Sequence, residues 1–459
     1  MAYATSEQSN DSLKTVEWMW KSNPDPWSKS EPEEWSHYSD VENLIMEEAF
    51  SNKQPRALLD GYYIDFQDNL EVSDLDSKKQ RPVKRVVRKR EDKYLREARF
   101  VDLSVSSGRS FGGRYGWVSP FVIEVRRDLG LQSEELPTKK PDMIPMLVEK
   151  AALGIIEEGK YLQKQKEAEH LANMLKATKN EDMEEVWDCC AYLYSLESFL
   201  YTTLNAAMIL VGEKEHEQVW RSKIRTLGPF CLLLWDDPFN KKATRNKTLY
   251  RGAHLKPEQI TKYEDMAKNS NEYRSFQAFT SCSRNFQKAV EFGNTLFILE
   301  VLFAFIADLS EHSEYPQEEE ELITPGVCFR VKSVRFNRTI NKHFIHLELR
   351  QRFDLYYEHI LPWKESRKSD ISFETLLLLL WIDFYSLYKK MKKECFKQTW
   401  KNSDAQRFVF KDLNITVALG PITLSYQNSH LRESCSRENN TRLNRRKVSP
   451  FLSKALLKR

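Results

Sequence analysis

Three short motifs between residues 250 and 326 carry the side chains that are best suited to chemistry. They are Tyr250-Arg251-Gly252, then Phe279-Thr280-Ser281-Cys282-Ser283, and then a run of glutamates from Glu318 to Glu321. A guanidinium presents a planar fork of donors to phosphate oxygens, and small hydroxyls orient a ribose. Paired carboxylates stabilise an oxocarbenium-like ribosyl cation and activate an incoming nucleophile. The motifs together predict a site that cleaves a glycosidic bond of a dinucleotide.

The glutamate run is the sharpest of the three motifs. A strand projects alternate side chains to the same face, so a strand here would pair Glu318 with Glu320. It would pair Glu319 with Glu321 on the other face, and the apolar Leu322-Ile323 would anchor it. A solvated patch of charge is the ordinary explanation for consecutive acids. The two neighbouring motifs favour a catalytic pair instead.

The arginine and serine motifs are weak when each is taken alone. Arg251 follows a strand-like segment, where a surface salt bridge is the simpler explanation. Gly252 would let a ligand approach the backbone. Ser281 and Ser283 would face one side of a strand, and solvated hydroxyls at a sheet edge are an equally good explanation. Phe279 is a candidate aromatic wall for a flat heterocycle.

The segments around these motifs predict a helical region followed by strands. Apolar residues at steps of three or four between residues 184 and 211 predict one buried helix. Strand-rich sequence behind helices is typical of an α+β domain. Strands are expected at residues 248–251, 277–281, 295–302 and 327–336.

An aromatic-rich unit occupies the chain up to about residue 90. The alternation at Trp18-x-Trp20 and at Tyr62-x-Ile64-x-Phe66 predicts half-buried strands, and residues 41–50 follow a helical period. Beyond this unit, residues 121–125 fit a strand, and residues 142–178 fit a charged, solvated connecting helix. The sequence assigns no role to that intervening stretch.

Composition excludes several classes of function. A net charge of +3 over 459 residues gives no global field for nucleic acid, so no direct nucleic-acid site is expected. The polar N-terminus lacks an export signal, and the longest apolar run, residues 376–382, is too short to span a membrane. The seven cysteines contain no C-x-x-C pair, which predicts reduced thiols in a cytoplasmic or nuclear protein.

In this order, the three motifs resemble the arginine-specific mono-ADP-ribosyltransferases of the R-S-E group. The resemblance covers about residues 196–336, including a helical lead-in at Ser198 to Asn205 and Ser313-Glu314-Tyr315-Pro316 before the acids. It implies NAD as substrate and no metal. It also implies a helical lead-in and two packed, mainly antiparallel sheets around an NAD cleft. The NAD-binding residues that it implies are Arg251, Gly252, Ser281, Phe279 and Ser313.

The resemblance also implies a role for each catalytic group. Arg251 would organise the NAD site through the phosphates and the nicotinamide ribose, and Ser281 would hold that ribose. The last glutamate of a Glu-x-Glu pair would stabilise the ribosyl cation. The first glutamate would activate the acceptor guanidinium, and it is the family's mark of arginine specificity.

Two registers fit the Glu-x-Glu pair to the run of four. Counting back from Gly326-Val327-Cys328-Phe329 makes Glu320 the catalytic acid and Glu318 its companion. Counting from the apolar pair that follows the acids makes them Glu321 and Glu319 instead. We expect the register with Glu320 and Glu318.

The N-terminal unit, taken as residues 8–90, resembles a WWE domain. The resemblance implies a half-barrel sheet with one helix. Such domains bind the iso-ADP-ribose unit of poly(ADP-ribose) or contact proteins of the ubiquitin pathway. The segments that carry the resemblance are Trp18-x-Trp20, Trp35-Ser36-His37-Tyr38, Glu48-Ala49-Phe50 and Tyr62-Tyr63-Ile64-Asp65-Phe66.

By the same resemblance, Tyr38 and Tyr62 would line an adenine pocket, and Arg81 would face a phosphate. The glutamine that is usual six residues after Asp65 is replaced by Glu71. A carboxylate is unfavourable beside phosphates because the two groups carry like charges.

The predicted organisation is therefore α+β with four parts. They are a WWE domain (8–90), a linker and helical region (91–183), an ADP-ribosyltransferase domain (184–356), and a helical segment with a disordered basic tail (357–459). The predicted reaction transfers ADP-ribose from NAD to protein arginine with release of nicotinamide.

Three alternatives to this reaction remain open to different degrees. One is an adaptor that binds poly(ADP-ribose) or ubiquitin-pathway proteins through its WWE domain and has a catalytically weak NAD fold. Another is an NAD glycohydrolase, in which water replaces the arginine acceptor. A poly(ADP-ribose) polymerase is disfavoured, because that group has a histidine where Arg251 stands.

Overall fold

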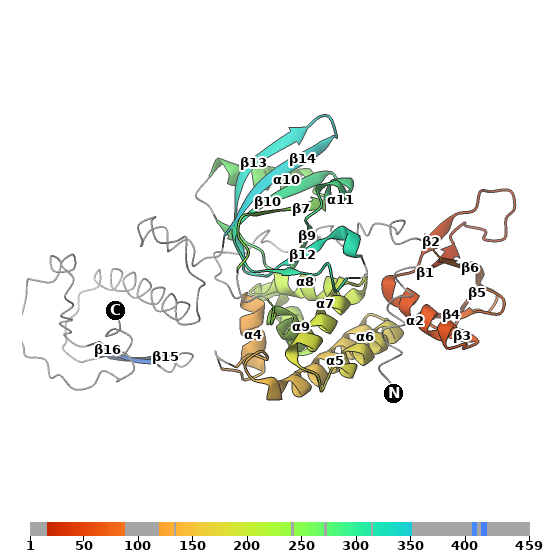
Figure 1. Ribbon diagram of the computed structural model, residues 1–459, viewed down its shortest axis with the longest axis horizontal. Helices are drawn as coiled ribbons and strands as arrows, with labels where there is room; N and C mark the ends of the chain where they lie inside the picture. Colours follow the sequence, from red (N-terminus) through yellow and green to blue (C-terminus); the bar gives the residue numbers. More distant parts are fainter. Residues whose placement is uncertain are drawn as a thin grey trace, which may run out of the picture. The chain divides into compact units, whose positions relative to one another are not determined.

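The computed structural model describes residues 16–87, 119–132, 135–239, 243–269, 273–313, 315–350, 406–410 and 415–419. The chain divides into two compact units, Met1–Leu379 and Leu380–Arg459. In the second unit, β15 (Gln406–Phe410) and β16 (Ile415–Leu419) pair as an antiparallel hairpin (Figure 1). The rest of the expected C-terminal segment and tail, 357–459, lies outside the described residues.

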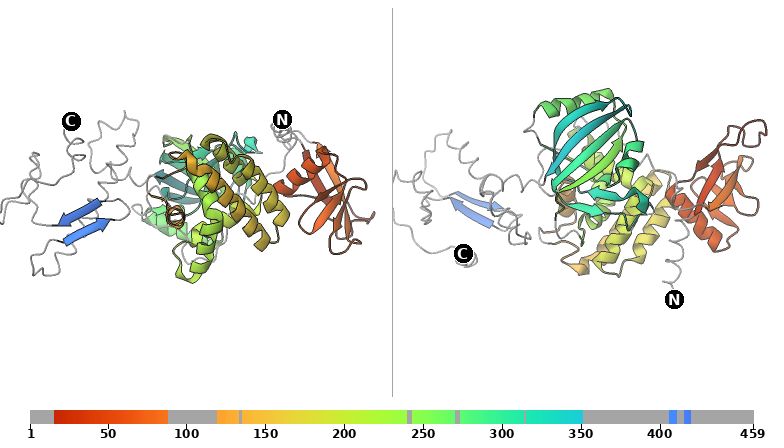
Figure 2. Two further views of the ribbon diagram at one scale, coloured as in Figure 1. Left: turned by 90° about the horizontal axis from the view of Figure 1, so that it is seen from below. Right: turned by 45° about the horizontal axis from the view of Figure 1, so that its top comes forward.

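One six-stranded sheet and one helix form the N-terminal domain (Figure 2). Neighbouring strands are antiparallel, and α2 (Asp40–Ser51) shares a core with the sheet around the buried Trp18. Ser39 and Glu42 form a capping box that fixes the start of α2. The predicted half-barrel with one helix is confirmed. The strand order is β2 (Trp35–His37), β1 (Val16–Lys21), β6 (Gln80–Val87), β5 (Leu70–Ser73), β4 (Tyr62–Asp65) and β3 (Arg56–Leu58).

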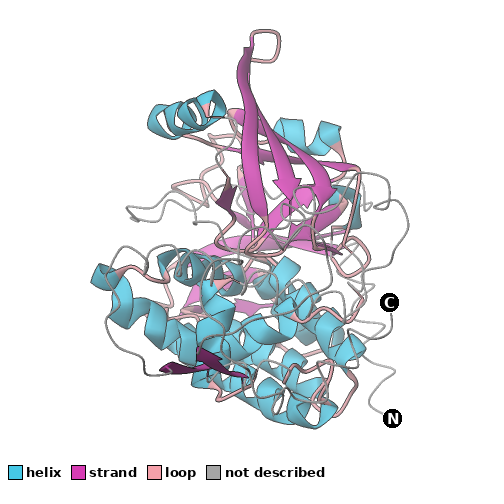
Figure 3. Cartoon of the chain, turned by 90° about the vertical axis from the view of Figure 1, so that its left-hand side faces the viewer, coloured by secondary structure: helices cyan, strands magenta, loops and turns pink. Residues whose placement is uncertain are grey.

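A layer of helices follows and packs on one side of the second sheet (Figure 3). Its helices share one apolar core, in which the side chains of Trp187, Tyr194 and Phe230 are among the largest that are fully buried. The helices are α4 (Pro120–Asp128), α5 (Ile144–Tyr161), α6 (Gln165–Ala177), α7 (Met183–Ser195), α8 (Phe199–Leu210) and α9 (Glu217–Trp235).

Three segments of this layer differ from the sequence-based expectation. Residues 121–125 belong to helix α4, because Ser119 caps it and Pro120 takes its first position. Residues 142–178 form α5 and α6, whose apolar faces are buried in the core, so they are not a solvated connection. The helix expected at 184–211 is divided into α7 and α8. Its apolar stripe runs across the break because both helices pack into the same core.

The second sheet has eight strands, and α10 (Pro257–Lys268) and α11 (Phe286–Glu291) lie in its connections. Its hydrogen-bonded neighbours are antiparallel except for β10 and β14, which are parallel. The predicted strands at 248–251, 295–302 and 327–336 are confirmed, whereas the strand expected at 277–281 begins three residues later, at Thr280. The order is β11 (Ile306–Asp308), β12 (Glu320–Ile323), β9 (Thr280–Ser283), β7 (Lys247–Ala253), β10 (Thr295–Phe303), β14 (Lys342–Arg350), β13 (Cys328–Asn337) and β8 (Arg274–Ser275).

A weak junction divides this sheet into two halves. β7 pairs with β10 along its whole length, but it meets β9 through the single pair Tyr250 and Ser283. On one side of the junction, Leu322 and Ala307 join the core of the helical layer. A second core lies among the strands and α10, and it crosses the junction, because it includes Cys282 and Ile323 from the first half. These halves are the two mainly antiparallel sheets that the family resemblance implies.

Within the described ranges, none of the helices combines the length and the apolar character that a membrane crossing requires.

Candidate active site

Arg251 and Ser281 meet where the pairing between the two sheet halves stops. Arg251 lies in β7, one residue beyond Tyr250, which is the β7 residue that pairs with β9. Its Nη1 donates to the carbonyl oxygen of Ser281, with a distance of 2.7 Å between the two atoms. Both residues are buried. The guanidinium therefore links the two halves at their junction and brings two of the three motifs together.

The register between β12 and β9 brings the third motif to the same place. Glu320 lies opposite Ser283, and Leu322 lies opposite Ser281. Residues that face each other across an antiparallel ladder project to the same side, as do alternate residues of one strand. Glu320, Ser281 and Ser283 therefore share one face, and Glu321 points to the other face. The side chain of Glu320 is fully buried.

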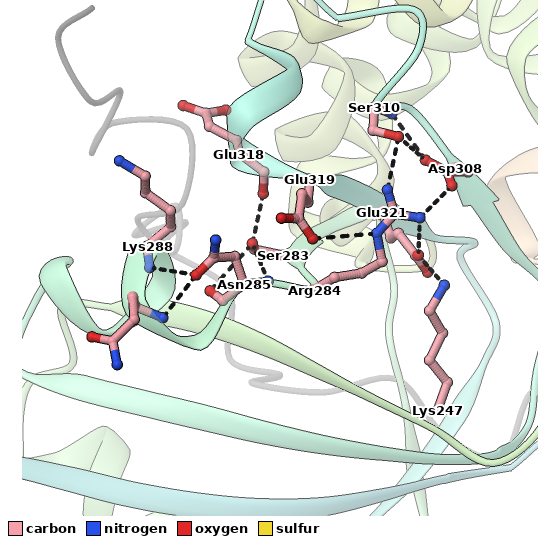
Figure 4. A network of polar contacts seen from close by, with 11 residues as sticks. Lys247, Ser283, Arg284, Asn285, Lys288, Asp308, Ser310, Glu318, Glu319 and Glu321 are labelled. Atoms are coloured by element: carbon pink, nitrogen blue, oxygen red, sulfur yellow. Dashed lines mark hydrogen bonds and ion pairs between the residues drawn. The ribbon is translucent and has the colours of Figure 1, made fainter. Parts of the chain in front are cut away.

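Glu321 belongs to a network of charges on the opposite face of β12 (Figure 4). It forms an ion pair with Lys247, and the Nη1 atom of Arg284 lies 3.3 Å from its Oε1. Arg284 also donates to Asp308 at 2.6 Å and to the hydroxyl of Ser310 at 2.9 Å. Burial raises the pKa of Glu321, and the Lys247 ammonium opposes that shift. The carboxylate of Glu321 is thus held between two cations.

The predicted strand does not include all four glutamates. β12 begins at Glu320, and Glu318 ends a short 3-10 helix, η4 (Pro316–Glu318). Glu319 between them has a φ of 47°, in the left-handed region. That turn aims Glu318 away from the charge network (Figure 4). Glu318 and Glu320 therefore belong to different elements, and strand alternation does not relate their side chains.

The backbone of this turn is fixed to β9. The Ser283 hydroxyl donates to the carbonyl oxygen of Glu318 at 2.6 Å. The backbone N–H of Arg284 donates to the carbonyl oxygen of Glu319 at 3.1 Å. The serine motif thus supports the position of the acids as well as lying on the same face as Glu320.

The structure gives Gly252, Phe279 and Ser313 contacts within the protein. A Cβ on Gly252 would lie 2.4 Å from the carbonyl oxygen of Ala289, so its missing side chain makes room for the neighbouring chain. The Phe279 ring is buried in the helical core, with its centroid 5.5 Å from that of Tyr194. The Ser313 hydroxyl accepts the N–H of Tyr315 at 3.1 Å.

The tyrosines that were predicted to line the WWE pocket lie together. The ring centroids of Tyr38 and Tyr62 are 6.3 Å apart. The Tyr38 hydroxyl donates to Glu71 at 2.7 Å, and the Tyr62 hydroxyl donates to Glu42 at 2.6 Å. Burial is the main cause that raises the pKa of Glu71. The cluster is therefore acidic, and Glu42 is a member that the sequence reading missed, although its capping box marks its position.

Arg81 lies beside this cluster, but its guanidinium binds backbone carbonyl oxygens of the WWE domain itself. It is opposite Glu71 in the ladder between β5 and β6. Its Nη1 donates to the carbonyl oxygens of Lys21 and Asn23 at 3.0 and 2.9 Å, and its guanidinium lies over the Trp20 ring. The structure thus places Arg81 near the pocket tyrosines while giving its guanidinium partners in the domain itself.

Lys247, Arg284 and Asp308 were also missed by sequence reasoning. A basic residue directly after Ser283 is the one feature that could have suggested Arg284 as a partner for the acids. Among the described residues, no group of three or more histidine, cysteine, aspartate or glutamate side chains is arranged to hold a metal ion.

Two family models match this chain. The family described as NAD:arginine ADP-ribosyltransferase matches residues 160–352, and the WWE domain matches residues 16–85. The first match begins before residue 184 and takes in α6, α7, α8 and α9 of the helical layer together with the second sheet. No curated protein matches the chain.

Solved structures of bacterial proteins are similar to parts of the chain. ADP-ribosyltransferase HopU1 of Pseudomonas syringae is 18% identical over 39% of this chain and 87% of its own, with a TM-score of 0.32. The type III effector XopAI of Xanthomonas axonopodis is 15% identical over 51% of this chain and 100% of its own, with a TM-score of 0.34. ADP-ribosyltransferase Vis, solved with agmatine, is 18% identical over 44% of this chain and 85% of its own, with a TM-score of 0.29.

Proposed function

We propose that this chain, a member of the NAD:arginine ADP-ribosyltransferase family with a WWE domain before its catalytic domain, modifies protein arginine side chains. ADP-ribose transfer from NAD is the activity of that family. The observation that carries the arginine-directed proposal is the arrangement of Arg251, Ser281 and Glu320 at the junction of the two sheet halves. There Arg251 is bonded to the Ser281 backbone, and Glu320 shares a face with Ser281 and Ser283.

The first half of the proposed reaction breaks the bond between the nicotinamide nitrogen and the anomeric carbon of the ribose. The bonding electron pair leaves with nicotinamide, so positive charge develops on the ribose. The Glu320 carboxylate, on the face of the serines, stabilises that charge, and the Ser281 hydroxyl orients the ribose. Arg251 supplies a fixed cation for the NAD phosphates, since its guanidinium is always charged and the bond to the carbonyl oxygen of Ser281 holds it in place.

The second half joins the acceptor to the same carbon. A guanidinium nitrogen of the acceptor arginine attacks the ribosyl cation and forms the new carbon–nitrogen bond. The proton that this nitrogen loses goes to the Glu318 carboxylate and then to solvent. The products are ADP-ribosylarginine, nicotinamide and a proton, which balances the reaction.

The surroundings of Glu321 support Glu320 as the catalytic acid. Glu321 is bound by Lys247 and lies near Arg284, so its negative charge is already compensated. A carboxylate paired with two cations stabilises a third positive charge poorly. The pair Glu318 and Glu320 therefore suits the reaction better than the pair Glu319 and Glu321.

Glu318→Gln separates transfer to arginine from simple cleavage of NAD. We expect it to lower transfer of labelled ADP-ribose to agmatine by about 100-fold, because the acceptor loses its base. Nicotinamide release should stay within about threefold, since water needs less activation once the cation has formed. The measurement follows both products from the same reaction.

Glu319→Gln is the matched control, because its side chain is 43% exposed and lies against Arg284. It should leave both products unchanged. A Glu318→Gln variant that labels agmatine as fast as the unmodified chain would contradict the role proposed for Glu318. Release of nicotinamide without labelled agmatine in the unmodified chain would instead favour an NAD glycohydrolase.

We also propose that the WWE domain binds ADP-ribose on modified proteins through Tyr38 and Tyr62, and weakly while Glu71 is ionised. The ionised carboxylate repels the phosphates of such a ligand. Glu71→Gln removes that charge and should tighten the binding of iso-ADP-ribose at neutral pH by about tenfold. Titration calorimetry with the full chain measures this effect. Equal affinities of the two proteins would contradict it and favour a WWE domain that contacts protein alone.

A further inference from the structure

A short turn carries Glu318, and its first residue reaches the N-terminal domain. We define the acid turn as residues 315–319. The carbonyl oxygen of Tyr315 accepts the N–H of Glu318 at 2.9 Å, which closes the turn. The position of the Tyr315 backbone therefore bears directly on where Glu318 lies.

The Tyr315 side chain is anchored on helix α2 of the WWE domain. Its hydroxyl donates a hydrogen bond to Oδ1 of Asp40, which lies in the first turn of that helix. The other carboxylate oxygen, Oδ2, accepts the N–H of Glu197 at 2.7 Å, just before α8. Tyr315 is 8% exposed and Asp40 is half-buried, so this bond is partly shielded from water. Asp40 thus ties the acid turn to the helical layer from outside the catalytic domain.

Further contacts hold the WWE domain on the helical layer. The Asp60 carboxylate accepts the N–H groups of Lys166 and Glu167 at 2.8 and 3.1 Å. These groups begin α6, which has no side-chain cap of its own, so Asp60 acts as the cap. Val41 and Leu44 of α2 are buried in the same core as the helices. Helix α2, which carries Asp40, is therefore held in place against the helical layer.

We propose that Asp40 is a positioning residue for ADP-ribose transfer, so that the WWE domain holds the catalytic acid turn in place. This inference rests on the proposed function, because only that function makes Glu318 in the turn a catalytic group. A hydrogen bond to a charged acceptor is stronger than one between neutral groups, and burial strengthens it further. Loss of the bond removes this anchor of Tyr315, so that Glu318 can shift from its working position.

Four variants of the full chain test this role through agmatine labelling. Asp40→Ala and Tyr315→Phe should each lower kcat about tenfold, because small displacements of catalytic groups cost rate. The KM for NAD should stay unchanged, since neither residue touches the constellation at Arg251. The double variant should be no slower than either single variant, because both remove the same bond. Asp40→Asn, which keeps an acceptor oxygen, should recover most of the rate.

Asp60→Ala is the matched control. It removes a contact of the same kind between the two domains, but it does not touch the acid turn. It should lower the thermal midpoint and leave kcat unchanged. Equal losses of kcat in Asp40→Ala and Asp60→Ala would overturn the proposal, because weaker attachment of the WWE domain to the helical layer would then explain both losses. An unchanged kcat in Asp40→Ala would overturn it as well.

Hydrogen exchange separates a failure of this proposal from a failure of the proposed function. The amide of Glu318 is bonded to Tyr315, and that of Arg284 is bonded to Glu319. Asp40→Ala should speed exchange at both amides about tenfold, whether or not the protein labels agmatine. Unchanged exchange there would overturn the role of Asp40, even in a protein that transfers ADP-ribose normally.

Discussion

Glu320 and Glu321 are neighbours in β12, but their side chains lie on opposite faces of the strand. One faces the serine motif, and the other is held by Lys247. The sequence predicts the residue types of the site because an arginine, a serine pair and glutamates suit one reaction. It leaves the register open, because the left-handed turn at Glu319 and the pairing with Lys247 depend on contacts between distant segments.

Glu71 offers a prediction of pH dependence at the same scale. Burial raises its folded pKa above the ordinary value, so the folded protein holds this proton more tightly than the unfolded chain does. The stability that it contributes is present below the unfolded pKa and is lost as pH rises through the folded pKa. Glu71→Gln cannot ionise and still offers an oxygen to Tyr38. It should therefore raise the thermal midpoint at neutral pH by a few degrees.

Thermal unfolding of both proteins from about pH 4.5 to pH 7 checks this prediction. The curves should converge at the acid end and separate toward neutrality. Glu31→Gln in the same domain is the control, because Glu31 is exposed. A lower midpoint for Glu71→Gln at neutral pH would show that the bond from Tyr38 to the charged carboxylate outweighs the cost of burial.

At the scale of elements, the sequence predicts strands better than it predicts breaks between helices. Alternating or continuous apolar runs gave β1, β7, β10 and β13 because strand periodicity is local. The break between α7 and α8 could not be predicted from the sequence, because the same apolar stripe continues across it. Helix α9 was missed because Pro229 lies inside it, where a proline ordinarily ends a helix.

The approach of α11 to β7 explains why Gly252 follows the arginine. A Cβ at this position would lie 2.4 Å from the Ala289 carbonyl oxygen and 2.5 Å from the Phe292 Cβ. Gly252→Ala must therefore push the segment after α11 away from β7, beside Arg251. We expect a loss of about 1–3 kcal/mol of stability, together with weaker NAD binding.

Denaturant unfolding and NAD titration measure the two effects. Thr248→Ala in the same strand is the control, because Thr248 is exposed and should lose well under 1 kcal/mol. A Gly252→Ala protein with unchanged stability and NAD affinity would mean that the packing of α11 does not determine the position of Arg251.

At the scale of the whole molecule, the proposed catalytic groups depend on segments that are far apart in the sequence. Arg251, Ser281 and Glu320 meet because β7, β9 and β12 are neighbours in one sheet. Asp40 reaches the same region from the N-terminal domain. Local patterns could predict the WWE and transferase domains separately. They could not predict the contact between them, because Asp40, Asp60 and the apolar face of α2 meet residues that are far away in the sequence.

The central claim is that Glu320 at the sheet junction drives ADP-ribose transfer to arginine. Its most direct test incubates the purified full chain with labelled NAD and agmatine, beside Glu320→Gln and Glu319→Gln. We expect the unmodified chain and Glu319→Gln to label agmatine, and Glu320→Gln to lose about 100- to 1,000-fold in rate. Full activity in Glu320→Gln, or its loss in Glu319→Gln, would contradict the account.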